Sequence, residues 1–104
     1  MLLRDLAHAR SGDKGGTSDI TVVAYDAAGY DVLQREITAE RVRTHFPELP
    51  ISAVERYELP QLHALKFVLH GALGGGVTRT LDLDAHGKCL SSCLLGLPIL
   101  SEHE

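Results

Sequence analysis

The chain has 104 residues, of which 44% are apolar and 23% charged, and its formal net charge is −4. That length predicts one domain over residues 1–104, folded around a single core. The acidic balance argues against nucleic acid as a partner, the charged Arg4 and Asp5 leave no room for a signal-peptide core, and no run reaches the roughly 18 apolar residues of a membrane span, so we expect a soluble cytoplasmic protein.

The first half of the chain predicts strands around a helical segment. Residues 2–9 favour a strand. Residues 20–25 form the clearest strand, because both alternating sets are apolar, as in a central strand covered on both faces. Residues 30–46 indicate two short helices, the second capped by Thr38. Residues 52–59 predict a strand whose charges place it near a sheet edge.

The second half predicts one helix followed by a hairpin. Residues 61–73 carry apolar side chains at helical spacing after Pro60 and end at three glycines. Residues 77–84 and 89–97 are expected to pair as the two arms of a hairpin. The order strand, strand, helix, strand, helix, strand, strand favours an α+β fold. We expect a ferredoxin-like sandwich with a mostly antiparallel sheet of four to five strands and two helices on one face.

The two cysteines, Cys89 and Cys93, both fall on the predicted strand 89–97. On a strand they would lie about 13 Å apart, whereas a disulfide needs Cα atoms closer than about 7 Å. The chain also lacks the paired Cys and His spacing of a zinc site. We therefore expect free thiols and no metal site.

The segment 10–17 is the most informative motif of the chain. Its candidate binding residues are Arg10, Ser11, Gly12, Asp13, Lys14 and Gly15. Glycine lets a ligand approach the backbone, and the two basic side chains could hold an anion there. A tight turn capped by Asp13, with a solvated Lys14, accounts for the same residues. The motif is not a P-loop, because its lysine comes too early and a strand follows it.

A nucleophile system of His8, Ser11 and Asp13 has the residue types of acyl transfer. Residues so close in sequence seldom meet in the geometry of a catalytic triad, and no strained G-x-S-x-G turn is present. The sequence therefore assigns no catalytic residue, and whether the chain is an enzyme stays open.

Four residues later in the chain complete the candidate ligand-binding set: His70, Gly74, Gly75 and Arg79. On the predicted helix, His63 and His70 would lie about 10 Å apart, too far to share a metal ion. His70 either lines a cleft at the glycine-rich end of that helix or lies on its surface. Arg79 interrupts the apolar side of its strand, so it either pairs with an acid, Glu55 or Asp13, or points into a site.

Five segments resemble, in order, the small C-terminal ferredoxin-fold domain of the acyclic terpene utilisation (AtuA) family. They are HARSGDKG (8–15), TAERV (38–42), VERYELP (54–60), LHAL (62–65) and GALGGGVTR (71–79). The resemblance extends over nearly the whole chain. It implies a ferredoxin-like fold and a stand-alone version of a domain that follows a larger N-terminal domain in longer members.

That resemblance also implies an accessory or ligand-binding subunit, working with a separately encoded AtuA-type large subunit in the breakdown of terpenoid or branched acyl-CoA compounds. It implies an acyl-CoA or another anionic small molecule as ligand, whereas it assigns no catalytic residue and leaves the cofactor unknown. The chain departs from the family pattern at Gly16, where we expect an acid, and at Asp19, where we expect Asn. If those two positions contact a ligand, the departures predict a different ligand or none.

Homo-oligomerisation is a further expectation, since paired copies are common among soluble proteins. Two alternatives to an accessory subunit stand beside it. One is a small acyl-CoA lyase or hydratase with Asp13 or His8 as base. The other is a purely structural oligomerisation module.

Overall fold

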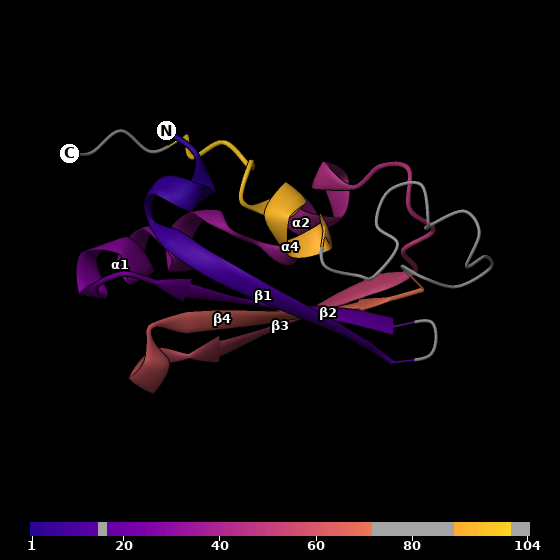
Figure 1. The fold of residues 1–104 in the computed structure, drawn as a ribbon, viewed down its shortest axis with the longest axis horizontal. Coiled ribbons are helices and arrows are strands. Elements are labelled where there is room, and N and C mark those ends of the chain that lie inside the picture. The colour runs from indigo at the N-terminus through magenta and orange to yellow at the C-terminus, as the bar shows by residue number, and fades with distance from the viewer. Residues whose placement is uncertain (15–16, 72–88, 101–104) are drawn as a thin grey trace.

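A computed structural model describes residues 1–14, 17–71 and 89–100 (Figure 1). Four strands form one antiparallel sheet in the order β1-β2-β4-β3. The strands are β1 (Ala7–Lys14), β2 (Thr17–Ala24), β3 (Ala53–Leu59) and β4 (Ala64–His70). The helices α1 (Ala27–Glu36), α2 (Ala39–His45) and α4 (Cys89–Leu94) lie on one face of this sheet. The predicted α+β, ferredoxin-like class is confirmed.

The β1–β2 hairpin corrects the predicted glycine-rich loop. Residues 10–14 are strand, paired in register with β2 from Ala7 opposite Ala24 to Lys14 opposite Thr17. The predicted strand at 2–9 was wrong in its first part, because Leu3–Asp5 forms a 3-10 turn. Backbone bonds of 2.9 Å from Leu3 N to Leu97 O and from Arg4 N to Leu95 O hold that segment against the C-terminal one.

Strand β2 is central, as predicted, but is covered on one face only. Ser18, Ile20, Val22 and Ala24 alternate as buried residues, and the side chains between them are half-buried. The one apolar outward residue of β2, Val23, is half-buried between His8 of β1 and Ala64 of β4.

Helices α1 and α2 begin at side-chain caps. The Asp26 carboxylate accepts a 2.8 Å bond from Gly29 N, and Thr38 Oγ1 accepts one of 3.1 Å from Arg41 N. The predicted cap at Thr38 is confirmed, and α1 starts three residues earlier than predicted because Asp26 satisfies its first-turn N–H. Strand β3 lies at the sheet edge, as predicted.

The predicted helix at 61–73 was wrong, because residues 64–70 form β4. Leu65, Phe67 and Leu69 are each 0% exposed, and Lys66 and Val68 between them are half-buried. That period of two is what a strand with one covered face requires. The apolar residues also matched helical spacing, and tertiary pairing with β2 and β3 decided between the two patterns.

The predicted return strand at 89–97 was also wrong, because Cys89–Leu94 is the helix α4. Its Leu90 and Leu94 are buried in the core, where α4 packs against β1 and β2. The other predicted hairpin arm, at 77–84, lies outside the described residues. Cys93 is a free cysteine. The 13 Å separation expected for the two cysteines does not apply on a helix, which rises only about 6 Å over four residues.

The core lies between the sheet and the helical layer. Its largest fully buried side chains include Phe67, Leu3, Ile20, Leu33, Ile37, Leu65, Leu69 and Leu90. In the described ranges, no helix has the length and hydrophobicity needed to cross a membrane. The second face of the sheet receives no α-helix from the described part of the chain (Figure 1). We call this second side the uncovered face.

Candidate functional site

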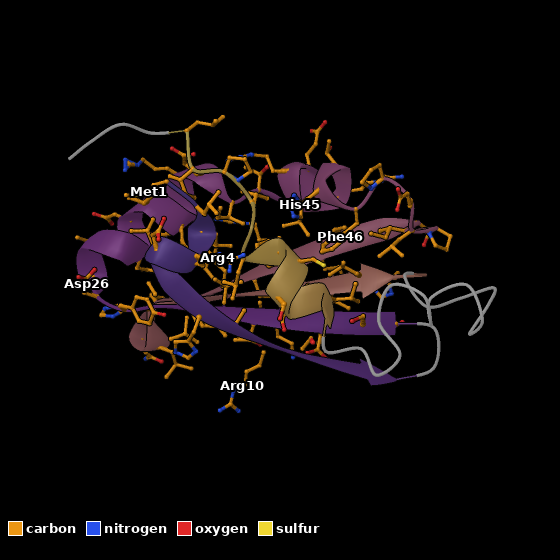
Figure 2. The ribbon with its side chains drawn as sticks, turned by 45° about the horizontal axis from the view of Figure 1, so that its top comes forward. Met1, Arg4, Arg10, Asp26, His45 and Phe46 are labelled. Atoms are coloured by element: carbon orange, nitrogen blue, oxygen red, sulfur yellow. The ribbon has the colours of Figure 1, made fainter. Side chains whose placement is uncertain are left out.

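Strand register arranges the side chains of the uncovered face in transverse rows. In one row, Arg10 is paired with Thr21, Thr21 with Lys66, and Lys66 with Tyr57. Residues directly opposite each other in a sheet point to the same face, so these four side chains lie side by side. We call them the cationic row. Arg10 projects away from the helical layer (Figure 2).

The next row toward the β1–β2 turn carries acids. It consists of Gly12, Asp19, Val68 and Glu55, which the register pairs in that order across the four strands. We call it the acidic row. Neighbouring rows are separated by two residues of strand, about 6.6 Å. The uncovered face therefore presents opposite charges in adjacent rows.

Glu55 is held by two side chains at the β3–β4 end of the acidic row. The Tyr57 hydroxyl donates to Glu55 Oε1, and His70 Nε2 lies 2.9 Å from Glu55 Oε2. The bond from Tyr57, followed by that from His70, lowers the pKa of Glu55, because both stabilise its carboxylate. The same bond to Glu55 raises the pKa of Tyr57, because it stabilises the protonated phenol.

Gly12 leaves the Asp19 carboxylate uncovered on the β1 side. A Cβ added to Gly12 would lie 3.6 Å from Asp19 Oδ2, an ordinary contact, so glycine is not needed for close packing there. The missing side chain instead leaves open space beside an acid. Within the described residues, the Asp19 carboxylate makes no hydrogen bond or ion pair.

The structure brings three predicted site residues to the uncovered face: Arg10, Gly12 and His70. Ser11 points to the opposite face, where its Oγ lies 3.4 Å from Ser91 Oγ of α4. Contrary to the prediction, His70 lies on a strand rather than a helix, and it contacts Glu55.

The remaining predicted site residues lie beyond what the structure describes. The backbones of Asp13 and Lys14 belong to β1, but their side chains are outside the described part. Gly15, Gly74, Gly75 and Arg79 lie outside it entirely. His8, the alternative base, is exposed, and its ring lies 5.8 Å from that of Tyr25. The acid–base alternative therefore stays a prediction.

Four grooves on the described surface lie elsewhere, around the helical layer. Two of them, of about 570 and 500 Å³, flank α2 and share Glu40 and Thr44. A third, of about 380 Å³, contains His45 and Cys93, and its histidine Nε2 lies 2.7 Å from the Cys93 carbonyl oxygen. None of the four includes a predicted site residue.

No cluster of three or more His, Cys, Asp or Glu side chains suited to a metal ion occurs in the part of the chain that the structure describes. The acidic row offers Asp19 and Glu55, and Val68 separates them on the strand between. The arrangement is suited to recognition by charge and shape.

Sequence reasoning missed Lys66, Glu55 and Tyr57 as members of the face. Glu55 and Tyr57 stand two apart on a correctly predicted strand, so alternation placed them on one side. Lys66 was assigned to a helix, which hid its relation to Arg10. The signal that could have found it is the alternation of Leu65, Phe67 and Leu69 around it.

No curated protein and no solved structure matches the chain at a significant level. A family model described as the AtuA ferredoxin-like domain matches residues 1–100. That range contains the hairpin, all four strands and the whole uncovered face, and it confirms the resemblance seen in the motifs. The chain belongs to the family of AtuA ferredoxin-like domains.

Proposed function

We propose that this domain is an accessory, protein-binding module that acts in an assembly with an AtuA-type large domain and binds protein through its uncovered sheet face. The observation that carries the proposal is the contrast between the two sides of the sheet. Three helices of the described chain cover one side, and the other presents ordered charged rows with no helix from the described residues. Membership of the AtuA family supports the choice of partner.

The composition of the uncovered face supports a protein as its occupant. Tyr57 on β3 is 47% exposed, Tyr25 just past the end of β2 is 63% exposed, and Val68 is half-buried between charged neighbours. Aromatic and arginine side chains are enriched at protein interfaces. Cations and acids in neighbouring rows also select a partner by charge complementarity, which acts on specificity and association rate.

Co-expression of the chain with an AtuA-type large domain from the same organism tests this function. We expect the two to co-purify. Lys66→Glu should weaken the complex at least about tenfold, because a reversed charge in the middle of the face meets the wrong sign. Glu40→Lys on α2 is the matched control and should leave the complex intact. Failure to co-purify, or loss of the complex with the control alone, would contradict the proposal.

A small anion is a second candidate ligand, favoured by the cationic row. Arg10 and Lys66 lie two strands apart, about 10 Å, with the Thr21 hydroxyl between them and that of Tyr57 beyond. A diphosphate or acyl-CoA could span such a pair of cations. Calorimetric titration with coenzyme A and with pyrophosphate measures this directly. Binding of one of these compounds that Arg10→Ala and Lys66→Ala each remove would support a small-anion ligand. Absence of heat with both compounds would exclude it.

A further inference from the structure

We propose that the uncovered face takes a second copy of this chain, packed face to face about a twofold axis that runs parallel to the transverse rows. The inference rests on the proposed function, which makes this face a protein-binding surface: in the isolated chain a second copy occupies the face that the large domain binds in the assembly. The inference also fixes the orientation of that copy. The two helical layers of the pair then face outward.

The charge pattern is self-complementary for this axis. An axis that lies between the two rows and parallel to them turns the cationic row of one copy onto the acidic row of the other. Lys66 of one copy then lies between Asp19 and Glu55 of the second copy, because these acids stand on the strands either side of its own. Opposite charges meet twice, once for each copy.

The alternative twofold axis, parallel to the strands, makes the opposite prediction. It turns each row onto the same row of the second copy, so that Lys66 of one copy lies over Thr21 of the other, beside both Arg10 and Lys66. Like charges placed together across an interface strongly disfavour association. The row pattern therefore selects the axis parallel to the rows.

Gly12 gives the same orientation a steric basis at the sheet edge. Under the proposed axis, Arg10 of one copy lies over Gly12 of the other, since both belong to β1 in adjacent rows. The missing side chain leaves space for a guanidinium to reach the Asp19 carboxylate, which lies beside Gly12. Arg10 is exposed and projects from the face, as this contact requires (Figure 2).

The size of the face sets the expected strength of the dimer. Four strands of seven to eight residues give a flat area of about 450 Å² per copy. A standard stable interface buries about 800 Å² per partner. We therefore expect a reversible dimer with a dissociation constant in the micromolar range. Because exposed charge pairs contribute to it, salt should weaken the dimer.

Sedimentation equilibrium of the chain alone, from micromolar to millimolar concentration, tests the dimer. Lys66→Glu should raise its dissociation constant at least about tenfold, because the introduced carboxylate would meet the two acids of the second copy. Asp19→Lys should do the same, because the introduced ammonium would meet Lys66. Circular dichroism establishes that each variant is folded, and Glu40→Lys on α2 should leave the dimer unchanged.

Mixing the two variants is the decisive measurement. In a mixed dimer, the new glutamate of Lys66→Glu meets the new lysine of Asp19→Lys, and the remaining Lys66 meets the remaining Asp19. Both contacts are attractive and outweigh the repulsion that remains between the new glutamate and Glu55, so the mixture should dimerise more tightly than either variant alone. A dimer that Lys66→Glu strengthens would indicate the axis parallel to the strands and overturn the proposed orientation, as would a mixture that stays monomeric.

The outcomes for the dimer and for the proposed function can be told apart. A chain that is monomeric at every concentration, but co-purifies with the large domain, would overturn the dimer and leave the accessory function standing. A charge-dependent dimer that never binds the large domain would establish the dimer and refute that function.

Discussion

The two faces of the sheet carry different kinds of side chain, although the same four strands form both. On β4, Leu65, Phe67 and Leu69 are fully buried under the helices, whereas Lys66, Val68 and His70 alternate with them on the uncovered face. The buried side chains must be apolar and of the right volume, because a closely packed core does not accommodate a change in side-chain size. The outward set carries charge in ordered rows. Substitutions on the two faces should therefore separate stability from binding.

The largest contrast is expected between Phe67 and its neighbour Val68. Phe67→Ala leaves a cavity in the core and should lower the free energy of unfolding by about 3–5 kcal/mol. Val68→Ala removes two half-buried methyl groups and should cost about 1 kcal/mol. Denaturation by urea measures both. Equal losses would mean that something as densely packed as the helical layer covers the second face.

Two arginines on opposite faces give the next contrast. Arg56 donates two hydrogen bonds of 2.9 Å to carbonyl oxygens at the end of α1. Its Nε donates to Ile37 O, and a terminal nitrogen donates to Gln34 O. Arg56→Ala should cost about 1.5–3 kcal/mol, as for other hydrogen bonds from a charged group. Arg10→Ala should change stability by less than about 0.5 kcal/mol. A costly Arg10→Ala would show that Arg10 has a structural role.

Two glycines, Gly71 just after β4 and Gly12 within β1, differ in what a side chain would meet: a backbone that needs glycine at one, open space at the other. Gly71 has φ +85, and a Cβ there would lie 2.7 Å from Pro50 O. Gly71→Ala should therefore cost about 2 kcal/mol. Gly12→Ala should leave stability nearly unchanged, yet weaken the dimer by obstructing Arg10 of the second copy. Thermal denaturation and sedimentation of both variants check this pair.

The smallest effect is expected from Tyr57→Phe on the uncovered face. Loss of the Tyr57 hydroxyl removes the hydrogen bond that is the main cause of the lowered pKa of Glu55. The pKa of Glu55 should therefore rise toward its ordinary value of 4.5. A lowered carboxyl pKa stabilises the fold above pH 4.5, and this contribution is lost as pH falls through the lowered value. The difference between variant and parent should therefore vanish in acid. NMR titration of the Glu55 carboxyl measures the shift, and an unchanged pKa would contradict it.

Local signals predicted the elements whose evidence lies in neighbouring residues. Thr38 marked the start of α2, because a side-chain cap acts within three residues. Strand β3 was recognised as an edge by its charges, and β2 as a central strand by its β-branched residues. The family motifs also extended across enough of the chain to identify the domain.

The failures arose where two local patterns fitted equally well. Leu65 and Leu69 stand four apart, as on a helix, but Phe67 between them makes the spacing that of a strand. Glycines in 10–17 indicated a loop, yet pairing with β2 holds residues 10–14 extended. Cys89–Leu94 became a helix because Leu90 and Leu94 fill the core above β1 and β2.

Residue types and short-range spacing were enough to predict the α+β class, the family, the cap of α2 at Thr38 and the acidic composition. Strand pairing was needed to show that Arg10, Lys66 and Tyr57 form one row and Asp19 and Glu55 the next. These residues come from four strands in two distant segments of the chain, 7–24 and 53–70. The register that aligns them is set by backbone pairing and by burial of the opposite face, and a slip of one residue would turn every one of these side chains inward.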